Sequence, residues 1–512
     1  MHVEEIIEEI WTFGRFQKIM LVTVLGPRGL LGWSMLVMSF TGTIPDWWCL
    51  PGPEGGNHGN HSKHGNVSFD NTTFHKCYTD GNATCRRVYS DTYNTIVNEW
   101  DLVCSRKWIT PIITSIQMGG VLFGALAGGQ SAEMFGRRKS HFIFMLIHAI
   151  TNVIAGFSVS WQMFAILRFL LGISVGALLV VSFTYYMEFI GKKWRSLCSG
   201  MPFWSMGVCL FALTAWLTPD WSNLHIICGV IHIPFLCGWF YIPESIRWLA
   251  VKNRLEEAEA VVLKVCQFNN RPKPEHTLGI LKLVADEERR LALDKKYTYI
   301  DIYRGWKMCR MSLLVQFQWA CLALVYYGIL FGVDALSGNL CLNIFLMGVV
   351  DIPADIATLY LNNRFGRKFT CLGYLVLGVI GALSVIIASI HAPPETRGVI
   401  ITTLALVAKV GVGSGWTAFQ VLTSESYPTV IRNLGYGAAG MLSRIGAIIA
   451  PFIFTLGGDS ILMPFIVVSV TMAVCIVVTC LLAETKDSPL EDTIASNPAK
   501  NKLMDQEELE KL

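Results

Sequence analysis

The chain has 512 residues, of which 53% are hydrophobic and only 15% are charged. Soluble domains carry about 25% charged residues, so this composition excludes an ordinary soluble protein and requires lipid around the apolar surface. The formal net charge is only +3, and the basic residues are spread along the chain, so no nucleic-acid partner is expected.

Twelve apolar runs are long enough to cross a bilayer, which takes about 20 residues as a helix. They are expected near 18–42, 109–131, 141–158, 162–187, 198–218, 223–242, 311–332, 339–361, 369–390, 399–422, 434–457 and 461–483. The segment Met1–Trp11 is acidic and amphipathic where a signal peptide would be basic and then apolar, so no cleavable signal is expected. The sequence predicts an all-α membrane protein of twelve transmembrane helices.

The first long connection, residues 43–108, has the features of an extracellular loop. Its four cysteines are Cys49, Cys77, Cys85 and Cys104. An even number of cysteines in an oxidising compartment predicts two disulfides, with three pairings open. The loop also holds four sequons, which predict a glycoprotein; these are Asn60, Asn66, Asn71 and Asn82. Its histidines stand among glycines and asparagines, and no metal site is predicted.

Basic residues gather in the short loops after the second, fourth, eighth and tenth predicted helices, whereas the alternate short loops are nearly bare. By the positive-inside bias, the N-terminus at 1–17, the connection at 243–310 and the tail at 484–512 face the cytoplasm. The connection is polar and contains helical patterns, so we expect it to pack beneath the helix bundle. The chain is predicted to be a multi-pass protein of the plasma membrane.

Four motifs of the first half recur in the same order in the second half, at offsets of about 230 to 241 residues. The pairs are Gly136-Arg137 with Gly366-Arg367, Arg168 with Lys409, Glu188 and Arg195 with Glu425 and Arg432, and Glu244-Ser245 with Glu484-Thr485. Such order would rarely arise by chance. The sequence therefore predicts a duplicated six-helix unit with halves at 18–242 and 311–483, and parallel repeats of this kind hold a substrate site between them near the bilayer midplane.

The loop after the second helix reads Gly129-x3-Glu133-x2-Gly136-Arg137-Arg138. Glycine lets two helices approach closely, and the acid and arginines can pair across the gap and close the cytoplasmic side. The alternative is a basic loop that only sets topology. The recurrence of the motif and its companion acid and arginine pairs favour a gating role.

Several strings along nearly the whole chain resemble the major facilitator superfamily and, within it, the organic ion transporters of solute carrier family 22. They are Gly14-Arg15-Phe16-Gln17, Glu99-Trp100-Asp101-Leu102-Val103-Cys104, Pro243-Glu244-Ser245-Ile246-Arg247-Trp248-Leu249, Tyr326-Tyr327-Gly328 and Glu425-Ser426-Tyr427-Pro428-Thr429-Val430-Ile431-Arg432-Asn433. The resemblance implies the major facilitator fold and transport by alternating access. Sugar porters share the Pro-Glu-Ser-x-Arg string, but Gln316-Phe317-Gln318-Trp319 differs from their seventh-helix pattern and argues against a sugar.

The resemblance also implies a set of gating residues on the cytoplasmic side, with the fourth-helix arginine as part of the same latch. They are Glu133, Arg137, Arg168, Glu188, Arg195, Glu244, Arg247, Arg367, Glu425, Arg432 and Glu484. The superfamily expects aspartate followed by arginine or lysine where this chain has Glu133 and Met134. One charge is thus kept and one pairing partner is lost.

Charged residues inside membrane helices are costly and suggest function. This chain has Arg28, Arg168, Asp351, Asp355, Lys409 and Arg444 at such depths. By resemblance, Arg444 stands where cation carriers have aspartate and where anion and carnitine-type carriers have arginine, and Lys409 resembles a basic residue of the same carriers. Asp355 stands where anion carriers often have lysine. The alternative is that the acids form internal salt bridges with Lys409 and Arg444.

Five aromatic residues fall where the family places a cage around its substrate, and they are also predicted to contact substrate: Trp204, Trp319, Tyr326, Tyr327 and Trp416. Aromatic faces stack on apolar groups and attract ammonium groups. Ordinary helix packing is the alternative for any one of them.

No phosphate-binding loop, zinc-protease motif or nucleophile elbow is present in the sequence, so neither an ATP-driven pump nor an enzyme is predicted, and no cofactor is expected. The predicted function is secondary transport of small organic ions, with organic anions or zwitterions favoured because of the three basic residues Arg28, Lys409 and Arg444. An organic cation carrier that uses Asp351 or Asp355 is the alternative. A non-transporting receptor on the same scaffold, a coupling ion and a counter-substrate stay open, and a monomer is expected.

Overall fold

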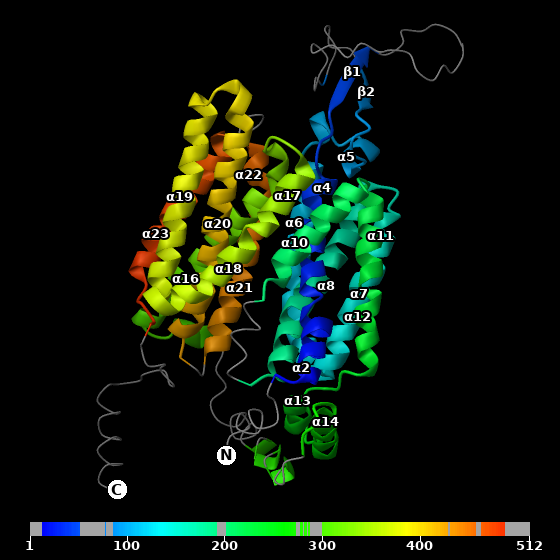
Figure 1. Ribbon diagram of the computed structural model, residues 1–512, viewed down its shortest axis with the longest axis vertical. Helices are drawn as coiled ribbons and strands as arrows, with labels where there is room; N and C mark the ends of the chain where they lie inside the picture. The colour runs from blue at the N-terminus through cyan, green and yellow to red at the C-terminus, as the bar shows by residue number, and fades with distance from the viewer. Residues whose placement is uncertain are drawn as a thin grey trace.

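The computed structural model describes residues 13–51, 77, 85–191, 201–272, 277–279, 281–283, 285–286, 299–428, 431–456 and 462–486. Figure 1 shows helical bundles side by side, with a small hairpin above the N-terminal bundle and short helices, including α13 and α14, below it. We call these two ends of the molecule the hairpin side and the linker side.

The N-terminal half runs from α2 to η3. Its elements are α2 (Arg15–Met20), the π-helical η1 (Leu21–Leu25), α3 (Arg28–Leu36), α4 (Met38–Thr41), β1 (Trp47–Pro51), β2 (Cys85–Tyr89), α5 (Ile96–Glu99), η2 (Cys104–Arg106), α6 (Ile109–Phe135), α7 (Arg137–Gly156), α8 (Trp161–Met187), α10 (Phe203–Leu217), α11 (Trp221–Ile231), α12 (Ile233–Leu236) and η3 (Cys237–Phe240).

The linker and the C-terminal half follow. Their elements are α13 (Ile246–Val251), α14 (Leu255–Phe268), η4 (Tyr299–Tyr303), α16 (Trp306–Phe331), η5 (Val333–Ala335), α17 (Leu340–Val349), α18 (Asp351–Phe365), α19 (Arg367–His391), α20 (Pro394–Ser426), α21 (Arg432–Ile449), α22 (Pro451–Leu456) and α23 (Leu462–Leu481).

The helices agree with the predicted membrane segments. In the described part of the chain, ten helical segments are long and apolar enough to cross a bilayer. The other two expected positions are occupied by α7, whose first residues are basic, and by the shorter α10. The architecture is therefore an all-α membrane bundle, as the apolar runs predict.

The first membrane segment is not a regular helix. Between α2 and α3, residues Leu21–Leu25 form a π turn, and Gly26 donates its backbone N–H to Leu21 O, five residues back. Pro27 follows and has no N–H to give, so the helix restarts with Arg28 at the first position of α3. Single π turns are often found at functional sites, and this one precedes a candidate substrate-binding arginine.

A second interruption lies between α17 and α18. Pro353 has no N–H with which to continue the hydrogen-bond ladder, and its ring crowds the preceding turn. The regular α-helix is interrupted at Val350, which keeps a helical backbone, and Asp351 stands in the first turn of α18. A carboxylate there is favoured by the positive end of the helix dipole.

The hairpin on the N-terminal bundle was not predicted from the sequence. Strands β1 and β2 are antiparallel, with Trp47 opposite Tyr89. Tyr89 donates its hydroxyl to Asp101 Oδ1 at 2.7 Å, and Arg87 forms an ion pair with the same carboxylate. A disulfide joins Cys77 to Cys104, which settles one of the open pairings, and Cys49 is also disulfide-bonded.

The four sequons Asn60, Asn66, Asn71 and Asn82 lie outside the described residues, as does the side chain of Cys85.

The linker is tied to the start of the chain. Phe16 donates its backbone N–H to Asn269 Oδ1 at 3.0 Å, and Asn269 Nδ2 donates to Gln17 Oε1 at 3.0 Å. The rings of Phe16 and Phe268 meet edge to face. The part of the linker that contains α14 thus packs beneath the N-terminal bundle, as Figure 1 shows.

Candidate substrate site and linker-side ion-pair clusters

The first ion-pair cluster, which we call the N-terminal cluster, is built around Arg137 at the start of α7. Arg137 Nε donates to Glu188 Oε1 at 3.1 Å, and another guanidinium nitrogen donates to Glu133 Oε1 at 2.7 Å. Glu244 accepts the backbone N–H groups of Arg137 at 2.8 Å and Arg138 at 3.0 Å. A carboxylate therefore caps the N-terminus of α7, where the helix dipole favours it.

The C-terminal cluster repeats this arrangement around Arg367 at the start of α19. Arg367 pairs with Glu425 at 3.0 Å. Glu484 accepts the backbone N–H groups of Arg367 at 3.0 Å and Lys368 at 3.1 Å. The sequence repeat is thus also a repeat of contacts, in which Arg367, Glu425 and Glu484 correspond to Arg137, Glu188 and Glu244.

Each cluster begins with a glycine whose backbone most other residues rarely adopt. Gly136 has φ 104° and ψ 157°, and Gly366 has φ 101° and ψ 161°. A Cβ atom at Gly136 would collide with the Glu244 carboxylate, and one at Gly366 would collide with that of Glu484. Glycine is therefore required at each position for two reasons, the backbone conformation and the close approach of the capping acid.

The acids of the two clusters differ in electrostatic setting. Burial raises the pKa of Glu188 above its usual value, although Arg137 opposes this. Glu484 is also partly removed from solvent, yet the hydrogen bonds that it accepts from backbone N–H groups hold its pKa below the usual value. Because its folded-state pKa is lowered, Glu484 stabilises the fold at neutral pH and loses that contribution as the pH falls through its folded-state pKa.

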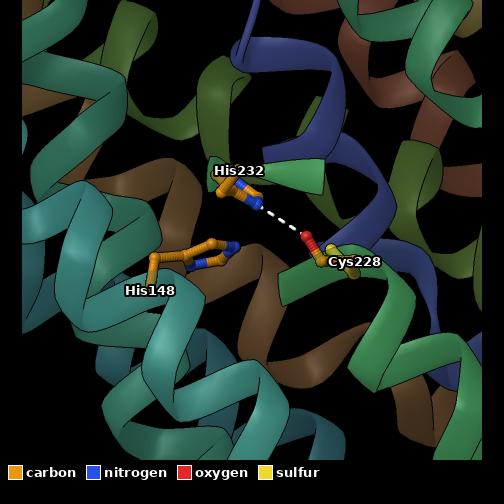
Figure 2. A group of neighbouring side chains, drawn as sticks. All are labelled: His148, Cys228 and His232. Atoms are coloured by element: carbon orange, nitrogen blue, oxygen red, sulfur yellow. Dashed lines mark hydrogen bonds between the residues drawn. The ribbon is translucent and has the colours of Figure 1, made fainter. Parts of the chain in front are cut away.

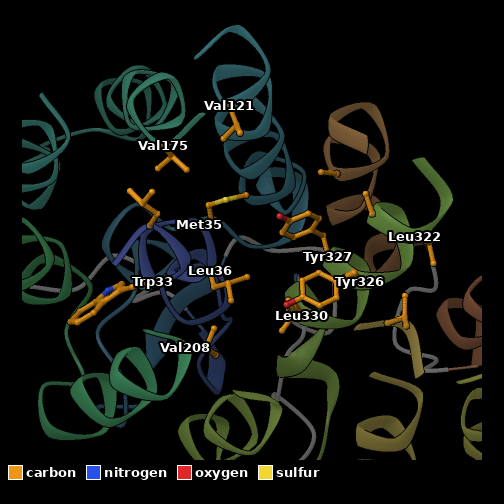
Figure 3. Packing of buried hydrophobic residues seen from close by; sticks show 14 of the residues in the cluster. Trp33, Met35, Leu36, Val121, Val175, Val208, Leu322, Tyr326, Tyr327 and Leu330 are labelled. Carbon is orange, nitrogen blue, oxygen red and sulfur yellow. The ribbon is translucent and has the colours of Figure 1, made fainter. Parts of the chain in front are cut away.

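The two halves are joined on the hairpin side. Ser39 Oγ donates to Leu330 O at 2.9 Å, and Ser115 Oγ donates to Ile448 O at 2.7 Å. The same side brings α10 against α17 and α6 against α21. Figure 3 shows Met35 and Leu36 of α3 near Tyr326, Tyr327 and Leu330 of α16, so the apolar core is continuous between the halves.

On the linker side the two clusters stay apart. The ion pairs of the two central arginines each lie within one half: Arg137 pairs with Glu133 and Glu188, and Arg367 pairs with Glu425. Among the described residues, no ion pair joins one cluster to the other. The molecule is therefore in a conformation in which the halves meet on the hairpin side and the linker-side acids and arginines are paired internally.

Arg168, which the resemblance assigns to this latch, lies away from both ion-pair clusters. Arg168 lies seven residues after the start of α8 on the hairpin side, whereas Glu188 follows the other end of that helix. Its guanidinium donates to Gln117 Oε1 and, at 3.2 Å, to Ser34 O. The resemblance of motifs does not indicate how deep a residue lies in the membrane. Arg168 lies near the hairpin-side end of α8, whereas the ion-pair clusters lie at the linker side.

Three more arginines were predicted to take part in gating: Arg195, Arg247 and Arg432. Arg195 lies outside the described residues. Arg247 and Arg432 are both engaged in contacts, and Arg247 is electrostatically close to Glu188.

In the C-terminal half, Lys409 of α20 and Asp351 of α18 form a buried ion pair. The two residues are 1% and 6% exposed. Lys409 Nζ also lies 4.8 Å from the centre of the Tyr326 ring. The sequence left open whether these two residues contact substrate or each other, and in this conformation they neutralise each other.

The remaining charged residues of the candidate site lack ion-pair partners in the part of the chain that the structure describes. Asp355 accepts a hydrogen bond from Thr417 Oγ1 at 3.0 Å. Arg444 interacts with Tyr327 and Tyr436. Arg28 interacts with Tyr436 and lies 5.7 Å from the centre of the Phe183 ring. Arg28 from the N-terminal half and Arg444 from the C-terminal half thus both interact electrostatically with Tyr436.

Aromatic rings of the C-terminal half form one connected group. Trp416 meets the rings of Tyr326 at 5.5 Å, Trp319 at 5.9 Å and Tyr327 at 6.3 Å between ring centres, each edge to face. Trp204 comes from the other half and lies beside the Tyr326 hydroxyl without a hydrogen bond of normal geometry. Four of the five predicted aromatic residues therefore contact one another directly.

The indole N–H groups of the group divide into two kinds. Trp319 Nε1 donates to Thr423 Oγ1 at 2.9 Å. Those of Trp204 and Trp416 are buried and have no hydrogen-bond partner among the described residues. Unpartnered buried donors are costly, and here they lie beside the aromatic group, where a substrate acceptor would satisfy them.

Tyr436 was missed by the sequence reasoning. Its ring lies 5.1 Å from that of Trp319, and it links the aromatic group to both unpaired arginines. A signal was available, because Tyr436 precedes Arg444 by eight residues in α21, and that spacing places both on one face of a helix.

Comparisons with known proteins identify related transporters. Residues 19–495 match the family described as "Sugar (and other) transporter". The chain is 28% identical to "Organic cation transporter protein" of Drosophila melanogaster, over 96% of this chain and 94% of the relative. It is 30% identical to "Solute carrier family 22 member 21" of Mus musculus, over 82% of this chain and 74% of the relative.

Two further comparisons concern a human relative and a solved structure. "Organic cation/carnitine transporter 2" of Homo sapiens is 29% identical, over 78% of this chain and 71% of the relative. The inward open conformation of the xylose transporter XylE from E. coli superposes with a TM-score of 0.65 at 18% identity, and the match covers 93% of this chain and 98% of that chain. At this identity the likeness concerns the fold alone.

Proposed function

The chain belongs to the major facilitator superfamily and, within it, to the organic ion transporters of solute carrier family 22, and on that premise we propose that its substrate is an organic anion or zwitterion. Members of this family are transporters of small organic ions and not enzymes. The proposal concerns the charge of the substrate and the residues that bind it.

The observation that carries the proposal is the pair Arg28 and Arg444. Neither has a carboxylate partner in the described part of the chain, and both act on Tyr436 between the halves. An unpaired guanidinium at membrane depth is costly, and a carboxylate or sulfate of a substrate would repay that cost with charge-assisted, bidentate hydrogen bonds. The free indole N–H groups of Trp204 and Trp416 offer two further donors.

Charge counting supports the same assignment. At depths well inside the membrane, the helices are expected to carry four basic residues, Arg28, Arg168, Lys409 and Arg444, against the two acids Asp351 and Asp355. Asp351 is already paired with Lys409. The interior therefore has an excess of positive charge that an anionic group would lower.

A second candidate is an organic cation. Among the described residues, Asp355 has the Thr417 hydroxyl as its only hydrogen-bond partner. The aromatic group offers ring faces to an ammonium, and relatives are named organic cation and organic cation/carnitine transporters. A zwitterion satisfies both sets of observations, with its carboxylate at Arg444 and its ammonium between Asp355 and the aromatic rings.

We further propose that the linker-side clusters act as the gate. When the halves close on that side, Arg137 and Arg367 exchange partners within their own half for acids of the other half. The linker side is then cytoplasmic, both termini are cytoplasmic, and the hairpin with its sequons is extracellular at the plasma membrane. These assignments rest on the arginine-rich loops and on the position of the disulfide-bonded hairpin, and the protein is taken to work as a monomer.

One uptake panel tests the substrate proposal. Labelled organic anions, a zwitterion such as carnitine and a quaternary amine are presented to cells that express the wild type, Arg444→Gln or Asp355→Asn. Loss of a charged hydrogen-bonding partner costs about 1.5–3 kcal/mol, so Arg444→Gln should raise KM for anions and zwitterions about tenfold to hundredfold. Lys307→Gln, at an exposed position on the linker side, serves as the matched control. Cation-only uptake that Arg444→Gln leaves intact would refute the assignment.

A further inference from the structure

The N-terminal half contains a second polar centre, away from the aromatic group. His148 of α7, Cys228 of α11 and His232 at the junction of α11 and α12 point toward one another, as Figure 2 shows. One nitrogen or sulfur atom of each lies within 4.8 Å of the others. The two histidines are fully buried and Cys228 is 1% exposed.

The hydrogen bonds fix the tautomers of both histidines. His232 Nδ1 lies 2.7 Å from Cys228 O, a carbonyl that can only accept, so Nδ1 carries the proton. His148 Nδ1 lies 2.9 Å from Ser174 Oγ, whose own hydrogen is donated to Leu171 O. His148 Nδ1 therefore also carries its proton, and Nε2 of each ring bears a lone pair.

The lone pairs are available for a ligand. His232 Nε2 is buried and has no hydrogen-bond partner among the described residues. His148 Nε2 accepts from Asn152 Nδ2 at 3.0 Å, and the same amide nitrogen also donates to His148 O, so Asn152 keeps a partner if Nε2 is taken. Histidines that bind metals hold one N–H on a carbonyl or hydroxyl in this way and bind through the other nitrogen.

The chain spacing suits a shared ion. Cys228 and His232 are four residues apart and lie on one face at the end of α11, and Pro234 follows in α12. His148 faces them from α7, which packs against α11. Two ligands from one helix and a third from its neighbour make a three-coordinate His2Cys set, which is typical of soft or borderline metals.

The surrounding charge selects the ion. Arg168 is electrostatically coupled to Cys228 and His148, and His225, coupled to Arg168, lies on the same side. No acid among the described residues is coupled to these groups. When a cation M+ binds, the Cys228 thiol releases its proton and forms an M–S bond, so the bound unit is neutral. A divalent ion would leave a net positive charge beside Arg168 at membrane depth, which is costly.

We propose that His148, Cys228 and His232 form a binding site for one soft monovalent cation, with Cu+ as the probe, that fastens α7 to α11. Nothing in this proposal depends on the substrate. The sequence does not indicate this site, because His148 and His232 lie on different helices that are far apart along the chain.

The test uses purified full-length protein in detergent under anaerobic, reducing conditions. Cu+ is supplied from a coloured competing chelator, and the bound ion is then examined by X-ray absorption for imidazole and sulfur neighbours. The wild type should withdraw one equivalent of Cu+ that has imidazole neighbours. Cys228→Ala should lose this equivalent, and His148→Gln and His232→Gln should weaken it at least tenfold.

Matched controls separate this site from other thiols and histidines. His141, a buried α7 residue that bonds Ser182, lies outside the cluster, and Cys321 lies in the other half; His141→Gln and Cys321→Ala should keep the imidazole-coordinated ion. Each variant is checked by gel filtration, and Cu+ should raise the melting temperature of the wild type but not of His232→Gln. The proposal is overturned if the wild type binds no imidazole-coordinated Cu+, if the controls lose it equally, or if Zn2+ binds and Cu+ does not.

Discussion

The two halves hold a buried cation at corresponding places in the repeat, but they stabilise it by different means. Arg168 of the N-terminal half has neutral partners, the Gln117 amide and the Ser34 carbonyl, and lies 5.9 Å from the Phe164 ring centre. Lys409 of the C-terminal half has the Asp351 carboxylate. Dipoles hold a charge without removing it, whereas an ion pair cancels it and can be opened by a charged ligand. The difference suggests that the C-terminal half carries the element that responds to substrate.

The largest effect is expected from breaking the C-terminal pair. Lys409→Met or Asp351→Asn alone leaves an uncompensated buried group, which costs about 3–5 kcal/mol when a pair loses one partner. The double variant Asp351→Asn with Lys409→Met removes both charges and should recover most of the melting temperature of the purified protein. A double variant no more stable than either single variant would show that the pair does not govern the stability of this half.

The corresponding change in the N-terminal half should cost less. Arg168→Met removes hydrogen bonds from a charged donor, worth about 2–3 kcal/mol, and leaves only neutral groups behind. Thermal unfolding of Arg168→Met beside Lys409→Met measures the contrast directly. If Arg168→Met proves the more destabilising of the two, the distinction between dipolar and ionic stabilisation fails.

Replacing the glycine of either linker-side cluster should have a similar effect. Gly136→Ala and Gly366→Ala each force alanine into a backbone conformation that costs about 1–2 kcal/mol and displace the capping carboxylate of Glu244 or Glu484. We expect similar losses of cell-surface protein and of uptake in both variants. Gly373→Ala, at an exposed helical glycine of α19 with open space around it, is the control and should behave as wild type. A loss confined to one half would mean that the duplicated geometry is used unequally.

The smallest effect on stability is expected from changing Glu133, an acid of the N-terminal cluster that has no acidic counterpart in the C-terminal cluster. Glu133 pairs with Arg137 but its side chain is 70% exposed, and the corresponding position of the second half is the exposed Asn363. Exposed pairs contribute about 0–1 kcal/mol, so Glu133→Gln and Asn363→Glu should shift the melting temperature little. Their uptake rates, compared at low and high salt, show whether this asymmetry matters to the gate. A large change in melting temperature in either variant would contradict the estimate.

Much of the fold follows from one-dimensional patterns. Apolar runs and repeated motifs identify the helices and the duplication, because a bilayer requires long helices and a duplicated chain keeps its order. The Gly136 and Gly366 contacts also follow, since each motif is local and its partner acid ends a helix of the same half. These patterns do not give the depth of a residue within the membrane, so the position of Arg168 away from the two clusters could not be predicted from them.

The missing parts of the site depend on contacts between distant segments. Tyr436 joins the candidate site because α21 lies beside α16, and His148 meets His232 because α7 packs on α11. Helical periodicity gives the face on which a residue lies but not the helix that it meets. The Lys409 and Asp351 pair was one of two alternatives in the sequence, and only the arrangement of α18 and α20 brings the two charges together.

The π turn at Leu21–Leu25 changes the rotation of α2 about the helix axis relative to α3. A π turn accommodates one residue more than an α-helical turn, and each residue of an α-helix advances by about 100° and about 1.5 Å. Deleting one residue from this turn would turn everything before it through roughly that angle relative to Arg28. The segment can therefore act as an angular spacer that sets where Phe16 and Gln17 meet Asn269 of the linker independently of where Arg28 faces.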